Sequence, residues 1–441
     1  MDEKQEQKFH QMTEEPVGRL ISHLAVPCII SMLVTAFYNM ADTFFVGMLH
    51  SNAATGAVGV VFSMMAVIQA VGFFFGHGSG NFISRELGKH HLEEASNMAA
   101  TGFFSALFTG LLICVFGEIF LTPLAAFLGS SPTILPYAKD YLRVILIGAP
   151  WMTASLVLNN QLRFQGNAIY GTIGIASGAV LNIGLDLLFV IPFKFGVFGA
   201  ALATDISQVI SGVLSFIYLC RKFDVLKMQK DDLAFSKKAC VRLMGIGVPM
   251  GLQCSITAIG SVIMQWAVNM LGSTAVAAVT AAGKTQNLLT VPLESVGTAM
   301  ATYAGQNLGA SRMDRVRKGT NSAMLIILVY GLASAFILHF TDVQIMGLFL
   351  DTAKEVDIVA MGRQYLFWNS VFFVPLGALI VWRYTIQGLG FSSLAMLAGV
   401  AEMIARTAVA IILVPILGYF GAELANPAAW VAACLFLYPA Y

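Results

Sequence analysis

Polar and ionisable side chains with cation-binding chemistry interrupt long apolar stretches in the first half of the sequence. They are Tyr38, Asp42, Asn182, Asp186, Thr204 and Asp205. Tyr38 and Asp42 are four residues apart, as are Asn182 and Asp186, so each pair would share one face of a helix. Carboxylate, amide and hydroxyl oxygens suit a hard cation, and crowded carboxylates also take up and release protons. The set predicts a Na⁺ or proton site, with the alternative that the carboxylates only hydrogen-bond helix ends.

Charged residues in the second half follow a different pattern. Glu402 and Arg406 are four residues apart, which favours an ion pair within one helix. Lys284 and Glu294 are ten residues apart, roughly 15 Å along a helix, so Lys284 needs another partner, such as Glu402, or a wet cavity. Glu294 is a candidate contact for a cationic substrate, with a gating or interfacial role as the alternative. Gln253 and Lys284 complete the expected substrate-binding set.

The chain that carries these side chains is unusually apolar. Of its 441 residues, 57% are hydrophobic and 11% are charged, and the mean hydropathy is +0.77. A soluble protein would carry about 25% charged residues. A soluble enzyme, a nucleic-acid-binding domain and a disordered scaffold are therefore excluded. At about 20 apolar residues per span, the composition predicts an all-α polytopic membrane protein.

Apolar stretches separated by polar, Gly or Pro residues predict twelve transmembrane helices. The expected spans are 20–47, 53–83, 96–127, 136–158, 168–191, 197–220, 243–270, 275–305, 320–340, 358–382, 392–415 and 419–438. Counted from these ends at about 1.5 Å per residue, Asp42, Asp186 and Thr204 lie at one depth, roughly 9–12 Å below the outer surface. The expected helices therefore bring the first-half polar residues into one layer.

The distribution of basic residues predicts the orientation of the helices. With a cytoplasmic N-terminus, 18 Lys and Arg residues lie on the inner side and 5 on the outer side. This bias satisfies the positive-inside rule. The protein is therefore expected in the cell (inner) membrane, with both termini in the cytoplasm.

The two halves of the chain repeat one another. Val26-Pro27, Met48-Leu49 and Gln165-Gly166 each recur 222 residues later, and the segment 196–203 recurs as 418–425. A repeat of half the chain over six helices predicts two bundles of equal orientation, related by a parallel pseudo-two-fold axis, as in many transporters. The expected organisation is a cytoplasmic segment 1–19, an N-lobe 20–220, a basic cytoplasmic linker 221–242 and a C-lobe 243–441.

With these features the sequence resembles the multidrug and toxic compound extrusion (MATE) family. The motifs that carry the resemblance are the 42–47 segment DTFFVG, Asn182-x-x-x-Asp186, GAALAT at 199–204 and QNLG at 306–309. No acid lies deep within 243–270 or 358–382, which indicates the DinF-like branch. The resemblance implies a transporter, not an enzyme, without a cofactor, that exports cationic or amphipathic drugs in exchange for H⁺ or Na⁺.

The resemblance also implies which residues couple transport to the ion. Asp42, Asn182, Asp186 and Thr204 match the family's N-lobe cation site and are the possible Na⁺ ligands, with Tyr38 beside them. Ion binding at Asp42 and Asp186 is expected to rearrange the first helix and expel substrate. Membrane lipid is a further expected partner, and binding of nucleic acid is not expected. One chain contains both lobes and could function as a monomer.

The alternative function is a lipid-linked oligosaccharide flippase of the same superfamily. Such flippases tend to have extra helices and a cationic central cavity, whereas here the buried charge is mostly acidic. A membrane enzyme would need a catalytic cluster near the membrane surface, and the sequence offers none. Efflux of a dye driven by an ion gradient would distinguish the antiporter from both.

Overall fold

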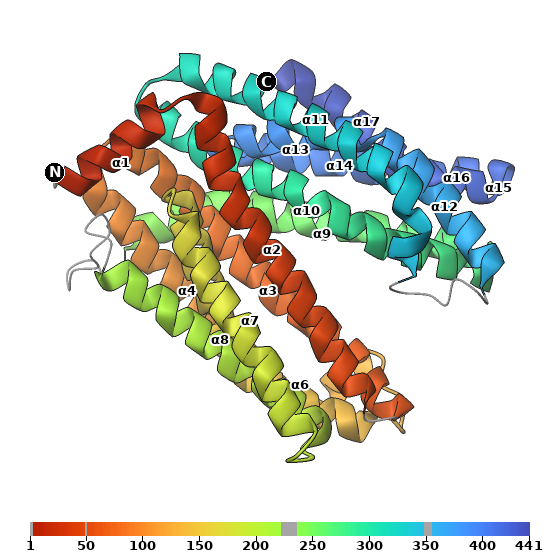
Figure 1. The fold of residues 1–441 in the computed structure, drawn as a ribbon. Helices are drawn as coiled ribbons and strands as arrows, with labels where there is room; N and C mark the ends of the chain where they lie inside the picture. Colours follow the sequence, from red (N-terminus) through yellow and green to blue (C-terminus); the bar gives the residue numbers. More distant parts are fainter. Residues whose placement is uncertain (1–2, 49–50, 222–235, 348–354) are drawn as a thin grey trace. The chain divides into compact units, whose positions relative to one another are not determined.

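The computed structural model describes residues 3–48, 51–221, 236–347 and 355–441, and every regular element in these ranges is a helix (Figure 1). This agrees with the expected all-α architecture. In the hydrocarbon interior of a membrane, backbone N–H and C=O groups must bond within the protein, and a helix satisfies them within one segment. The predicted linker 221–242 lies largely outside the described residues.

The described part of the first half forms eight helices, numbered along the chain. They are α1 (Glu3–Glu14), α2 (Val17–Gly47), α3 (Asn52–Gly88), α4 (Leu92–Ile119), α5 (Leu121–Phe127), α6 (Leu135–Phe164), α7 (Ala168–Val190) and α8 (Gly196–Arg221). The second half begins with three long helices and then becomes more broken. Its elements are α9 (Lys237–Asn269), α10 (Ser273–Gly309), α11 (Met313–Met346), α12 (Val356–Val371), α13 (Phe373–Gly388), α14 (Ser392–Ala408), η3 (Val409–Leu413), α15 (Val414–Leu417), α16 (Tyr419–Glu423), α17 (Ala425–Leu437) and η4 (Tyr438–Ala440).

Ten segments in the described ranges are long and apolar enough to cross a membrane. The pair α12 and α13 passes the same test as one span bent by 51°. Helix α10 is not among these segments, but its 37 residues are long enough to cross, and with it the spans number twelve.

The expectation of one continuous helix over 358–382 was wrong, because the chain bends at Phe372. Pro375 explains the bend. It has no N–H to give to the carbonyl of Val371, and its ring would clash with that carbonyl in a straight helix.

Contacts between α-carbons divide the chain into two compact units. The first comprises residues 1–12 and 26–251, and the second comprises residues 13–25 and 252–441. In the first unit, α6 is the central helix and packs against α3, α4, α7 and α8. In the second unit, α10 packs against α11, α12 and α13, and α14 packs against α17.

Small residues let these helices approach closely. On α4, a methyl group added to Gly110 would come within 2.6 Å of the Pro150 α-carbon on α6. On α3, a methyl group on Gly78 would lie 3.2 Å from the α-carbon of Gly247 on α9. Close contact between small residues is a common basis of helix packing in membranes.

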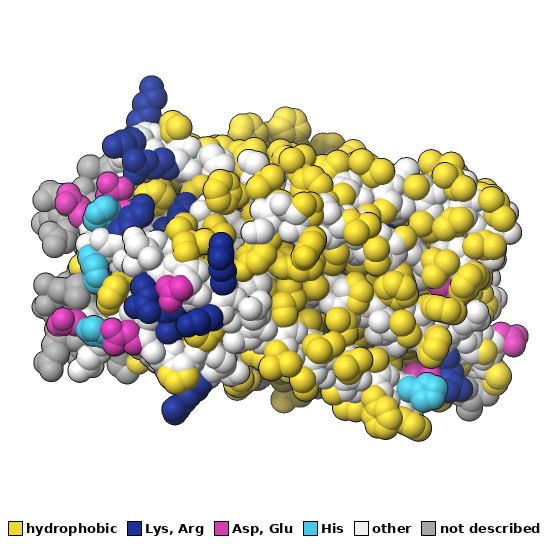
Figure 2. Space-filling view, turned by 90° about the horizontal axis from the view of Figure 1, so that it is seen from above, with side chains coloured by type: hydrophobic (Ala, Val, Ile, Leu, Met, Phe, Trp, Pro, Cys, Tyr) yellow, Lys and Arg dark blue, Asp and Glu magenta, His cyan; other side chains and the backbone are white. Residues whose placement is uncertain are grey.

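Large apolar side chains cover much of the outer surface. Phe108, Phe336 and Ile416 are among the exposed ones. Figure 2 shows hydrophobic side chains over most of the drawn face. This is the surface expected of a protein in contact with lipid.

Candidate cation and substrate sites

A buried polar layer lies between α7 and α8 in the first unit. Asn182 and Asp186 come from α7 and Thr204 comes from α8, and all three side chains are almost completely buried. The Asn182 Nδ2 atom donates a hydrogen bond to Thr204 Oγ1 at 3.3 Å. Three of the residues expected at the cation site therefore come from two adjacent helices, and two of them are in contact.

Glycines on α7 bring the two helices together. A methyl group added to Gly178 would lie 3.0 Å from the backbone oxygen of Ser207, and one added to Gly174 would lie 2.5 Å from the hydroxyl of Ser215. Both serines are on α8. Because only glycine leaves this space, α7 and α8 pack closely enough for Asn182 to reach Thr204.

Tyr38 on α2 contacts the side of α8 that carries Thr204. Its hydroxyl accepts a hydrogen bond from Gln208 Nε2 at 3.4 Å, and Gln208 is one turn after Thr204. Asp42 is one turn after Tyr38 on α2. The side chain of Asp42 is outside the part of the chain that the structure describes.

Asp205 is directed away from this layer. Its carboxyl group lies directly against Gly148 of α6. A side chain at position 148 would collide with the carboxyl group. Of the two interpretations of Asp205, this geometry favours a structural contact between α6 and α8.

The donor set of the layer fits a small cation. The Asn182 Oδ1 atom is buried and has no hydrogen-bond partner among the described residues. Asp186 contributes carboxylate oxygens and Thr204 a hydroxyl oxygen, which are hard ligands of the kind that Na⁺ prefers. The same carboxyl group could instead hold a proton. Residues 182, 186 and 204 are thus suitable for either ion.

A second polar group joins α9, α10 and α13 in the second unit. The Tyr384 hydroxyl donates to Glu294 Oε2 at 3.0 Å, and Gln387 Nε2 donates to Gln253 Oε1 at 2.9 Å. Tyr384 and Gln387 are three residues apart on α13, so they share one face of that helix. Gln253 on α9 and Glu294 on α10, two of the expected substrate contacts, therefore both contact one face of α13.

Gly297 makes the contact between Tyr384 and Glu294 possible. A methyl group at Gly297 would lie 2.5 Å from the Tyr384 ring. Without a side chain there, the ring packs on α10 and its hydroxyl reaches Glu294, which is about one turn earlier. Lys284, the third expected substrate contact, has an exposed side chain on α10.

A buried cluster of three charges links α13 and α14. Glu402 forms ion pairs with Arg383 and with Arg406, the latter at 3.6 Å, and all three side chains are at most 10% exposed. The expected pair of Glu402 and Arg406 is present. Glu402 thus has two arginine partners, and the suggestion that it neutralises Lys284 is not needed. Arg383, one of the 18 basic residues assigned to the inner side, is buried against Glu402.

The MatE family model matches the chain in two segments, residues 27–188 and 249–412. The two segments begin 222 positions apart, which is the spacing of the repeated dipeptides. Together they cover well over half of the chain.

The chain belongs to the MatE family.

Relatives of this MatE chain include multidrug export proteins. The chain is 24% identical to MepA of Staphylococcus saprophyticus over 399 residues, which cover 90% of the chain and 88% of that protein. It is 25% identical to MepA of Staphylococcus aureus over 406 residues, with coverage of 90% and 88%. Membership of this family makes the chain a membrane transporter, not an enzyme.

Solved structures have the same fold. An outward-facing multidrug resistance MATE family transporter of the MOP superfamily superimposes with a TM-score of 0.91 at 24% identity, over 98% of this chain and 96% of that one. A MOP superfamily transporter from Pyrococcus furiosus, described as having a binding pocket of reverse polarity, gives a TM-score of 0.90 at 24% identity, with coverage of 98% and 97%. The predicted polytopic helical fold is confirmed.

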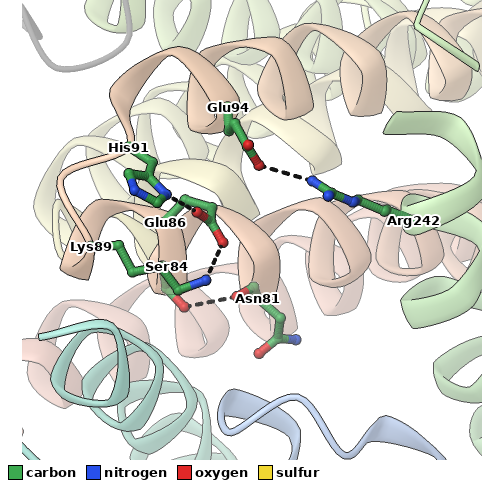
Figure 3. A network of polar contacts seen from close by, with 7 residues as sticks. All are labelled: Asn81, Ser84, Glu86, Lys89, His91, Glu94 and Arg242. Carbon is green, nitrogen blue, oxygen red and sulfur yellow. Dashed lines mark hydrogen bonds and ion pairs between the residues drawn. The ribbon is translucent and has the colours of Figure 1, made fainter. Parts of the chain in front are cut away.

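A polar network lies at one end of the first unit of the MatE chain (Figure 3). Glu86 accepts hydrogen bonds from Lys89 Nζ at 2.8 Å and binds His91 Nδ1 at 2.9 Å. Nearby, Arg242 at the start of α9 donates to Glu94 on α4 at 2.9 Å. His91 lies between α3 and α4, and its side chain is 57% exposed.

The sequence did not predict roles for two residues of the second unit, the partly buried Tyr384 and the fully buried Glu423. Tyr384 was not noticed because an isolated tyrosine in an apolar stretch has no distinctive spacing. Glu423 was noticed only as part of the repeated segment 418–425. The repeat could have pointed to Glu423. The equivalent position in the first half is Ala201, so an acid replaces a methyl group at a buried position.

Proposed function

We propose that the protein is a secondary antiporter that exports organic cations or amphipathic compounds in exchange for H⁺ or Na⁺. The observation that carries this proposal is the buried layer in which Asn182 bonds to Thr204 beside the fully buried Asp186. The multidrug export function in the names of the MepA relatives supports the direction and the type of substrate.

The coupling ion would act through the charge of Asp186. A carboxylate in a dry interior is costly unless a proton or a cation compensates it. Loading and release of the ion therefore change the free energy of the packing around α2, α7 and α8. One charge crossing 100 mV releases about 2.3 kcal/mol, which is enough for about a fifty-fold substrate gradient.

The ion would be held by Asp42, Asn182, Asp186 and Thr204, with the Tyr38 hydroxyl next to them. Na⁺ would use the amide and hydroxyl oxygens as well as the carboxylates, whereas H⁺ needs only a carboxylate. The dependence of ion affinity on Asn182 and Thr204 therefore separates the two ions.

Glu294, Gln253 and Lys284 are the proposed substrate contacts. A carboxylate attracts an organic cation, and its link to the Tyr384 phenol places an aromatic face next to it. Gln253 on α9 adds an amide, which contacts Gln387 on the same face of α13 as Tyr384. Amphipathic drugs with one positive charge fit such a mixed surface.

We place the lobes at 20–220 and 243–441, with the cytoplasmic segments 1–19 and 221–242 on the inner side of a bacterial membrane. The positive-inside bias supports this orientation of both termini. The absence of deep acids from the expected seventh and tenth spans supports the DinF-like branch. A monomer contains both lobes and would suffice for transport.

The test is export of a fluorescent organic cation by the purified protein in liposomes, under a pH gradient or a Na⁺ gradient imposed separately. Transport by the wild type should respond to one of these gradients. Asp42→Asn and Asp186→Asn should each abolish the response while the protein still elutes and melts as folded protein. A response that survives in both variants would refute the ion site, and no transport under either gradient would favour a lipid flippase.

A further inference from the structure

We infer that Glu423, with Asn369 beside it, forms a second binding site for a proton or a Na⁺ ion, within the second unit. This site is separate from the layer of Asn182, Asp186 and Thr204. Its part in transport rests on the proposed antiport, whereas ion binding at the site does not.

Glu423 is a buried acid without a donor. It ends the five-residue helix α16 and is 0% exposed. Neither of its carboxyl oxygens has a hydrogen-bond partner among the described residues. An unpaired carboxylate in such surroundings is too costly to persist, so a bound proton or a bound cation must neutralise it.

Asn369 on α12 supplies a further free oxygen. It is also 0% exposed, and its Nδ2 atom donates to the backbone oxygens of Tyr365 at 2.9 Å and Glu423 at 3.4 Å. With the amide nitrogen engaged in this way, the Oδ1 atom is left without a partner in the described part of the chain. Carboxylate and amide oxygens are suitable ligands for a hard monovalent cation.

The charged and titratable groups around Glu423 do not neutralise it directly. Arg406 on α14 is ion-paired with Glu402. Tyr365 on α12 accepts a hydrogen bond from Asn426 at 2.9 Å, and Tyr419 on α16 itself donates to the backbone oxygen of Met361.

Three other described elements, η3, α15 and α17, pack on α16, and none of them carries a charged side chain. Helices η3 and α15 carry no titratable side chain. Helix α17 carries only Cys434, whose thiol donates to Pro375.

The backbone around Glu423 is broken in several places. Helix α12 ends at the 51° bend, η3 is a π-helix, and α15 ends at Gly418, where φ is +59°. Helix α16 then ends at Glu423 itself. Interrupted helices free backbone carbonyls, and transporters commonly coordinate ions with them. π-Helical turns are also frequent at functional sites.

The internal repeat argues against a purely structural acid. The first half has the fully buried Ala201 at the equivalent position, so the same packing is built there without a carboxyl group. Three residues later, Asn426 is the equivalent of Thr204 in the first layer. The second half therefore combines an amide at the position equivalent to Thr204 with an added acid three residues earlier.

The test measures ion binding by the full-length protein in detergent, without transport. In one arm, proton uptake is counted after a shift from about pH 9 to about pH 6, a range in which ordinary carboxylates stay ionised. In the other arm, binding of radioactive Na⁺ is counted at constant pH. Glu423→Gln is expected to bind about one ion fewer per chain, in the proton arm or in the Na⁺ arm.

Three further variants make the result decisive. Glu118→Gln removes a partly exposed acid and should match the wild type in both arms. Glu423→Ala introduces the residue found at Ala201 and replaces Glu423→Gln if the latter does not fold. Asp186→Asn should lose its own ion independently, so that the double variant loses both.

Equal binding by the wild type and a folded Glu423 variant in both arms would overturn the inference, because a permanently protonated acid exchanges nothing. That outcome leaves the proposed antiport intact if Asp186→Asn still abolishes gradient-driven efflux. Conversely, loss of one ion in Glu423→Gln, together with no gradient-driven efflux by the wild type, would refute the antiport and retain the site.

Discussion

Asn182 on α7 donates a hydrogen bond to Thr204 on α8 across 3.3 Å, in a layer where both side chains are buried. The bond uses the amide nitrogen and leaves the Asn182 Oδ1 atom free of protein partners in the described part of the chain. The amide is thus oriented so that its oxygen can face a cation, with the Asp186 carboxylate one turn away on the same helix.

Thr204→Val should weaken coupling to the ion and leave the fold intact. It removes both a candidate ligand and the acceptor that orients Asn182, and the loss of an orienting partner typically reduces metal affinity by about ten-fold or more. The measurement is the Na⁺ or H⁺ concentration that gives half-maximal efflux in liposomes.

Thr153→Val is the matched control for this substitution. Thr153 is also a buried threonine, but its hydroxyl donates to the backbone oxygen of Ala106 at 2.9 Å, which links α6 to α4. Thr153→Val should cost about 1 kcal/mol of stability and leave the ion dependence unchanged. An equal shift of ion dependence in the two variants would argue against a specific role of Thr204.

Glu294→Gln should reduce affinity for cationic substrates and leave neutral amphipathic substrates unaffected. The substitution keeps the shape of the side chain and its contact with Tyr384 but removes the negative charge. The loss of one partly buried charge contact corresponds to about ten-fold in affinity. Apparent KM values for a cationic dye and a neutral dye provide the measurement, with Glu118→Gln as the control. Equal changes for both dyes would contradict the assignment.

The first-half layer could be predicted from the sequence because it depends on local geometry. A spacing of four residues puts Asn182 and Asp186 on one face, and the short connection from α7 to α8 makes these helices neighbours. Depth in the membrane then follows from the helix ends. None of these steps requires knowledge of how distant parts of the chain pack.

The second-half cluster could not be predicted in the same way. Arg383 lies five residues before the end of α13, where a basic residue is typical of the cytoplasmic surface. Its burial depends on the packing of α13 against α14, which brings Glu402 to it. Glu423 and Asn369 likewise meet only because α12 and α16 pack together.

Glu402→Gln should destabilise the protein strongly. The substitution leaves Arg383 and Arg406 buried next to one another without their shared carboxylate. Removal of one partner from a buried ion pair costs about 3–5 kcal/mol, which thermal melting in detergent would detect. Arg383→Met should cost less, since Glu402 keeps Arg406 as a partner. A larger loss in Arg383→Met than in Glu402→Gln would refute this account of the cluster.

The ion pair of Arg242 with Glu94 in Figure 3 should contribute little to stability. Its two atoms are 2.9 Å apart, but the side chains are 41% and 50% exposed. Solvent and salt screen such a pair, which typically contributes about 0–1 kcal/mol. A double-mutant cycle with Arg242→Gln and Glu94→Gln should give a coupling energy in this range, and higher salt should reduce it further.

Arg315→Gln tests a buried arginine against the exposed Arg242. Arg315 is 8% exposed and donates to Asn307 Oδ1 at 3.1 Å and to the backbone oxygen of Glu15 at 2.7 Å. Hydrogen bonds to a charged group in such surroundings are worth about 1.5–3 kcal/mol each. Arg315→Gln should therefore lower the melting temperature clearly more than Arg242→Gln does. Equal losses would mean that burial does not determine the strength of these cationic contacts, and that the Arg242 pair is stronger than its exposure predicts.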